Sequence, residues 1–101
     1  MKTCTTSDLK EAFQNDPDLF LIDCRTPEEY EAGHVPGAQR ITLGDDLGEY
    51  SWPKEKPIYV ICRSGGRSAA FCQELKNLGV DNAVNVEGGT LAWVEKEYRV
   101  E

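Results

Sequence analysis

The chain has 101 residues, of which 40% are hydrophobic, and its formal net charge is −7 at pH 7. This length predicts one domain, residues 1–101, with one modest core, and the negative charge disfavours nucleic acid and anionic membranes as partners. The sequence contains no apolar run long enough for a transmembrane helix and no apolar N-terminal segment of the signal-peptide type, which predicts no membrane association and a cytoplasmic location.

The first predicted elements alternate between helix and strand. Hydroxyl residues at positions 5–7 precede the amphipathic segment "SDLKEAFQN", a helix that ends before Pro17. The apolar run "LFLIDC", residues 19–24, predicts a strand buried on both faces. Thr26 is a suitable N-cap for a helix over residues 26–33, with Pro27 at its first position.

The second half of the chain continues the alternation. Its expected elements are a short strand at 39–43, a polar loop with one short helix at 44–57, a strand at 58–62, a helix at 67–79, a strand at 82–86 and a helix at 88–98. Strands that alternate with helices predict an α/β fold with a parallel sheet and helices on both faces. Ligand sites in such sheets lie beyond the carboxyl ends of the strands. Cys62, residues 23–25 and residues 87–89 all occupy such ends.

The segment "CRSGGRS", residues 62–68, has the composition of an anion-binding loop. A reactive cysteine needs a lowered pKa, and the amides and positive dipole end of the following helix favour a thiolate at Cys62. Glycines let successive amides point inward as a nest, and arginines add charge. We expect the anion to be bound by Arg63, Ser64, Gly65, Gly66, Arg67 and Ser68. A buried core cysteine followed by a solvated turn would not explain these residue types.

The four cysteines, at positions 4, 24, 62 and 72, form no C-x-x-C pair. With His34 as the one histidine, no zinc-ligand spacing exists, so the sequence predicts no metal site. The number of cysteines would by itself allow a disulfide framework, but a domain with a core of this size does not need disulfide bonds to be stable. A cysteine–histidine hydrolase would need His34 beside Cys62, whereas its place in the turn "GHVPG" favours a structural role.

Three segments together resemble the single-domain rhodanese family. They are "LIDCRTPEEYEAGHVPGA", "IYVICRSGGRSAAFCQEL" and "VNVEGGTLAW", and they cover nearly the whole chain in order. The resemblance implies a rhodanese-like three-layer fold with a five-stranded parallel sheet, and sulfur transfer as the activity. It implies that Cys62 takes a sulfane sulfur from thiosulfate or a persulfide donor and passes it, as a persulfide, to cyanide or a thiol, which includes a protein acceptor. No cofactor is expected.

The resemblance also gives roles to residues outside the loop. Asp23 and Arg25 match an Asp-x-Arg pattern that ties the loop to its neighbours, with an acid among residues 28–31 as the expected partner. Gly88 and Gly89 are expected to permit close backbone approach. Cys24 would lie on the strand next to that of Cys62. A resolving role for its thiol is conceivable, but the sequence favours simple packing.

Alternative functions follow from the same loop. Cysteine phosphatases of similar fold resemble C-x5-R, whereas Arg67 follows Cys62 with four residues between, which predicts a narrower cradle. Mercaptopyruvate-specific transferases resemble C-G-x-G-V-T, from which this loop departs. Non-catalytic rhodanese-like modules commonly lack the loop cysteine, and here it is present. The sequence leaves open the physiological donor, the acceptor and the oligomeric state.

Overall fold

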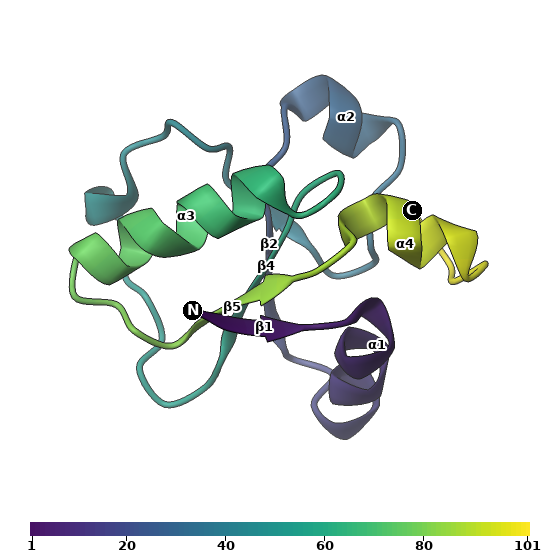
Figure 1. The fold of residues 1–101 in the computed structure, drawn as a ribbon, viewed down its shortest axis with the longest axis horizontal. Helices are drawn as coiled ribbons and strands as arrows, with labels where there is room; N and C mark the ends of the chain where they lie inside the picture. The colour runs from purple at the N-terminus through teal and green to yellow at the C-terminus, as the bar shows by residue number, and fades with distance from the viewer.

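The structure, a computed structural model, describes residues 1–101 (Figure 1). In chain order its elements are β1 (Lys2–Cys4), α1 (Thr6–Asn15), β2 (Phe20–Asp23), α2 (Pro27–Glu31), β3 (Gln39–Arg40), the 3-10 helix η1 (Leu47–Glu49), β4 (Ile58–Ile61), α3 (Gly66–Asn77), β5 (Ala83–Val86) and α4 (Gly89–Glu95). No helix is long and apolar enough to cross a membrane.

All five strands are parallel and lie in the order β1-β5-β4-β2-β3. The predicted α/β fold with a five-stranded parallel sheet is therefore confirmed. β4 is central, and its partner β2 pairs in a register that sets Asp23 opposite Ile61. The carboxyl ends of β2, β4 and β5 consequently meet at one edge of the sheet, which is where the sequence places the candidate site.

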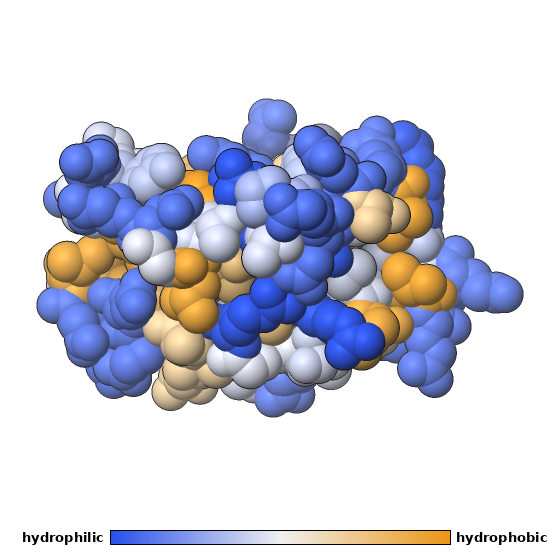
Figure 2. All heavy atoms as spheres, turned by 90° about the horizontal axis from the view of Figure 1, so that it is seen from above, coloured by the Kyte–Doolittle hydropathy of each residue, from blue (hydrophilic) through white to orange (hydrophobic).

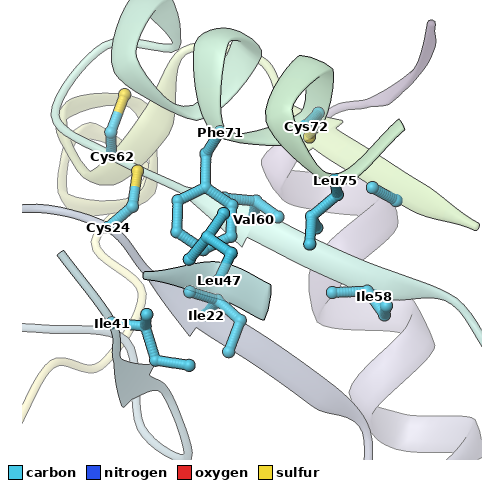
Figure 3. Packing of buried hydrophobic residues seen from close by; sticks show 11 residues of the cluster. Ile22, Cys24, Ile41, Leu47, Ile58, Val60, Cys62, Phe71, Cys72 and Leu75 are labelled. Atoms are coloured by element: carbon cyan, nitrogen blue, oxygen red, sulfur yellow. The ribbon is translucent and has the colours of Figure 1, made fainter. Parts of the chain in front are cut away.

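Alternate residues of the strands supply two separate cores, one on each face of the sheet. On one face α3 packs through Phe71 and Leu75 against the strands, together with Leu47 of η1 (Figure 3). On the other face Leu9 of α1 and Trp93 of α4 cover the sheet. Figure 1 shows α3 on one side of the strands and α1 on the other. This arrangement explains why the strands read as continuous apolar runs.

Side-chain caps fix where two helices begin. Thr5 and Thr26 each accept a hydrogen bond from the backbone of the third helical residue, Asp8 and Glu29, whose carboxylates bond back to the threonine amides. These two capping boxes satisfy amide groups that a helix leaves free. The predicted N-cap at Thr26 and the first helical position of Pro27 are confirmed.

Several element boundaries differ from the predictions. β1 was not predicted, because its three residues are too few to show a pattern and only Cys4 is partly buried. The strand expected at 39–43 is limited to Gln39–Arg40, both of them exposed. The ring of Trp52, in the loop after η1, packs edge-on against Phe20 and Phe71 within the α3-side core.

The surface is largely hydrophilic, with separate apolar patches on the face drawn in Figure 2. The larger exposed apolar side chains are spread along the chain, and only Leu91 and Val94 share an element, α4. They are Met1, Tyr50, Leu78, Leu91, Val94 and Val100.

Candidate active site

Cys62 directly follows β4, and a short loop leads from it to the start of α3 at Gly66. Its side chain is 1% exposed. The Gly65 amide donates a hydrogen bond of 3.1 Å to the Cys62 sulfur. Gly65 has a φ of 114°, a left-handed conformation that favours glycine, and it turns the chain so that this amide faces back to the sulfur. The loop thus presents backbone donors to one atom.

The surroundings of Cys62 favour its thiolate and lower its pKa to about 4. The largest cause is a hydrogen bond from the Cys24 thiol, followed by the hydroxyl and amide of Ser68 and the amide of Gly65. Burial opposes these effects, because it disfavours the charged form. The same hydrogen bond, together with burial, raises the pKa of Cys24. One thiolate and one thiol therefore share the buried edge of the sheet at neutral pH.

Ser68 and Asn85 form a buried polar pair beneath the loop. The Ser68 hydroxyl lies 3.3 Å from the Cys62 sulfur and 3.1 Å from the Gly65 carbonyl oxygen, and it also contacts the Asn85 side-chain oxygen. The side-chain amide of Asn85 donates a hydrogen bond of 3.3 Å to the same Gly65 carbonyl oxygen. Asn85 was not singled out from the sequence, although a polar residue within the apolar strand "NAVNV" is a signal for a buried partner.

Arg67 and Arg63 have different environments. Both terminal nitrogens of Arg67 donate to the carboxylate of Glu29, at 2.6 and 2.8 Å. This pairing lowers the pKa of Glu29 to about 2 and raises that of Arg67. Glu29 was one of several acids named for ion pairing, and it ties α2 to the start of α3. Because the charge of Arg67 is offset, exposed Arg63 is the unpaired cation of the loop. Ser64 is exposed as well.

Asp23 and Arg25 form a buried ion pair at the end of β2. Their closest atoms are 2.7 Å apart, and Arg25 also donates to the Gly33 carbonyl oxygen at 2.8 Å. The expected pairing of Arg25 with an acid of α2 is wrong, because the preceding Asp23 occupies its guanidinium. The pair fixes the chain between β2 and α2, next to the Cys62 loop.

The first turn of α4 packs directly on the backbone of the loop. The Thr90 amide and hydroxyl donate to the Cys62 carbonyl oxygen at 2.9 and 3.0 Å, and the Leu91 amide donates to that of Arg63 at 3.1 Å. A Cβ on Gly89 would lie 2.5 Å from the Arg63 carbonyl oxygen, and one on Gly88 would lie 2.7 Å from the Ala92 side chain. Gly89 is therefore where the close backbone approach occurs.

His34 contacts α2 and the C-terminal end of the chain. Its ring stacks on Tyr30 with centroids 3.7 Å apart, and its Nδ1 lies 2.9 Å from the Tyr30 carbonyl oxygen. Its backbone exchanges two hydrogen bonds with Glu101. These contacts give His34 a structural role in joining α2 to the C-terminal segment.

A parallel sheet with a strand-end cysteine, an amide loop and a helix start defines a rhodanese-like domain. Residues 5–96 match the Rhodanese-like domain family, so the chain belongs to that family. A Bacillus subtilis protein named "Putative sulfurtransferase YtwF" is 42% identical over 94 residues, which cover 92% of this chain and 90% of that protein. An Allochromatium vinosum protein named "Sulfurtransferase" is 31% identical over 86 residues, which cover 84% of this chain and 80% of that protein.

Solved structures agree with this assignment. The crystal structure of a rhodanese-related protein from Thermoplasma volcanium has a TM-score of 0.84 and 33% sequence identity. The match between the two structures covers 100% of this chain and 98% of the Thermoplasma volcanium chain. The fold and the family are thus established independently of the chemistry that the loop residues perform.

Proposed function

We propose that the protein transfers a sulfane sulfur from thiosulfate, through a Cys62 persulfide, to cyanide or a thiol acceptor. The observation that carries the proposal is the position of the Cys62 sulfur at the end of β4, where the Gly65 amide donates to it at 3.1 Å and the Ser68 hydroxyl lies 3.3 Å away. These surroundings lower the pKa of Cys62 to about 4. A thiolate that is ionised across the neutral range and surrounded by amides is suited to attack an electrophilic sulfur.

In the first half-reaction the Cys62 thiolate attacks the outer sulfur of thiosulfate. The new bond joins the two sulfurs, the bond within thiosulfate breaks, and sulfite leaves with its electron pair. The product on Cys62 is a persulfide anion. Exposed Arg63 supplies the charge that attracts the dianionic donor, and the loop amides stabilise the persulfide in the place where they stabilise the thiolate.

In the second half-reaction the acceptor attacks the outer sulfur of the persulfide, and Cys62 leaves as a thiolate. The hydrogen bonds that lower its pKa also make it a good leaving group, because they stabilise the same anion. Cyanide would leave as thiocyanate, and a thiol, small or on a protein, as its own persulfide. Arg67, Glu29, Asp23 and Arg25 hold the loop in shape and take no part in bond making.

The loop supports sulfur transfer over phosphate chemistry. Only four residues separate Cys62 from Arg67, and the guanidinium of Arg67 is occupied by Glu29, so it is not free to close a ring of donors around a phosphoryl group. A role as a non-catalytic binding module would leave the converging donors at Cys62 without a purpose.

The test is the steady-state rate of thiosulfate:cyanide transfer, measured beside aryl-phosphate hydrolysis. Cys62→Ser should abolish transfer while circular dichroism shows an unchanged fold. Cys72→Ser, which alters another buried cysteine of the same core, should retain most of the rate. Substantial transfer by Cys62→Ser, or robust phosphatase activity that depends on Cys62, would overturn the proposal.

A further inference from the structure

Cys24 faces Cys62 from the neighbouring strand. The β2–β4 register ends with Asp23 opposite Ile61, and the Cys24 amide continues the ladder with a 3.0 Å hydrogen bond to the Ile61 carbonyl oxygen. Cys24 therefore lies opposite Cys62, and residues paired in this way point to the same face of a sheet. Figure 3 shows the two sulfur atoms side by side and pointing the same way. Each side chain is 1% exposed.

The spacing of the two residues permits a covalent bond between them. Paired strands lie about 4.8 Å apart, within the Cα separation of roughly 4.4–6.8 Å that disulfides require. The proximity of the Cys24 thiol is the largest of the influences that lower the pKa of Cys62. Cys72 shares this core but lies on α3, farther along the sheet in Figure 3. Cys24 is thus the thiol positioned to react with whatever Cys62 carries.

We propose that Cys24 is a resolving thiol that attacks the Cys62 persulfide, releases hydrosulfide and leaves a Cys24–Cys62 disulfide. The inference rests on the proposed persulfide and adds a second activity to it. A persulfide that meets no acceptor is discharged internally, and an external thiol then reduces the disulfide and restores the enzyme.

The step balances in atoms and electrons. The Cys24 sulfur bonds to the inner sulfur, which is the Cys62 Sγ, and the bond between inner and outer sulfur breaks. The outer sulfur leaves as hydrosulfide and takes the proton of the Cys24 thiol. The sulfane sulfur is reduced by two electrons, and the two cysteines are oxidised to the disulfide. Two equivalents of an external thiol supply the electrons that reopen it.

The chemistry of Cys24 suits this order of events. Its raised pKa keeps the proton on the thiol while Cys62 is a free thiolate, so Cys24 does not compete with Cys62 for the sulfur donor. Once Cys62 carries the outer sulfur, the inner sulfur is neutral and electrophilic. The proton of the Cys24 thiol can then move to the outer sulfur, which is the basic leaving group of the reaction.

The experiment follows a loaded protein from which the donor has been removed and to which no acceptor is added. Wild type, Cys24→Ser, Cys24→Val and Cys72→Ala are treated with thiosulfate, or with inorganic polysulfide as a second donor, and are desalted. Intact mass and released sulfide are recorded over time. External thiol is left out because it would also release sulfide by direct attack. Two different Cys24 variants are used so that the comparison can still be made if one of them does not fold.

Wild type and Cys72→Ala should lose the added sulfur, release one equivalent of sulfide and end two hydrogen atoms below their starting mass. A non-reducing peptide map should link Cys24 to Cys62. Both Cys24 variants should keep the persulfide at least about tenfold longer, because attack by a positioned thiol avoids the entropic cost of a bimolecular reaction.

Equal persulfide lifetimes in wild type and the Cys24 variants would overturn the inference and leave the proposed function intact. Absence of any adduct on Cys62 from either donor would overturn the proposed function and, with it, the resolving role. A disulfide between Cys62 and a cysteine other than Cys24 would also contradict the proposal.

Discussion

Gly89→Ala tests whether the first turn of α4 holds the Cys62 loop in place. Gly89 has a φ of 58°, and a Cβ there would lie 2.5 Å from the Arg63 carbonyl oxygen and 2.6 Å from that of Cys62. The left-handed conformation costs a non-glycine residue about 1–2 kcal/mol. The contacted atoms are backbone, so the loop has to move away from the turn.

That movement breaks hydrogen bonds as well. The Thr90 amide loses the Cys62 carbonyl oxygen, and the Leu91 amide loses that of Arg63, each bond being worth about 0.5–1.5 kcal/mol. Together with the strain, we expect the free energy of unfolding in urea to fall by about 2–5 kcal/mol. Sulfur transfer should fall by more than about tenfold, because the displaced carbonyl belongs to the nucleophile itself.

A matched control separates the clash from the strain. Gly79 also has a positive φ, of 86°, but a Cβ there meets nothing within 4 Å. Gly79→Ala should therefore cost only the strain of about 1–2 kcal/mol and leave the rate of sulfur transfer unchanged. If Gly89→Ala were no more destabilising than Gly79→Ala, the close packing of α4 on the Cys62 loop would contribute nothing to stability.

Further predictions concern the thiolate and its surroundings. Because the pKa of Cys62 is lowered to about 4, its alkylation by iodoacetamide should be nearly constant between about pH 6 and 8 and should fall only as pH drops through that value, whereas an ordinary thiol gains about tenfold per pH unit in this range; a rate that climbs steeply through neutral pH would contradict the assignment. Asn85→Leu should cost about 1–3 kcal/mol in urea unfolding and move the alkylation midpoint upward, because the Ser68 hydroxyl loses its buried acceptor and the Gly65 carbonyl oxygen loses one of its donors, which loosens the loop around the Cys62 sulfur; an unmoved midpoint would limit Asn85 to stability. Arg63→Ala should raise the KM for thiosulfate several-fold at low salt with little change in kcat, whereas Arg67→Ala should lower kcat more than Arg63→Ala does. If Arg63→Ala instead lowered kcat and Arg67→Ala raised KM, the roles of the two arginines would be exchanged.

Local signals in the sequence were sufficient for much of the fold. The hydroxyl at Thr26 and Pro27 fix the start of α2, and the apolar run before Cys62 fixes β4, because these effects act within a few residues. β1 escaped prediction because a three-residue edge strand is held by its partner β5 rather than by its own pattern.

The partners of the site residues could be predicted less well, because they are distant in sequence. The loop itself was recognisable from its glycines and arginines. Glu29, however, reaches Arg67 across 38 positions, and Asn85 reaches the Gly65 carbonyl oxygen across 20. The neighbouring strands of Cys24 and Cys62 were expected from the family resemblance and are confirmed, but no single segment of the sequence encodes that strand order.

The most direct test of the central claim is the intact mass of the protein after brief incubation with thiosulfate and rapid removal of the donor, under acid conditions that halt thiol exchange. Wild type should gain the mass of one sulfur atom, located on Cys62 by peptide mapping, and added cyanide should remove it with formation of thiocyanate. Cys62→Ser and wild type alkylated beforehand at Cys62 should gain nothing. A sulfur adduct that forms equally in Cys62→Ser, or a wild-type protein that turns over thiosulfate and cyanide with no adduct at Cys62, would contradict the account.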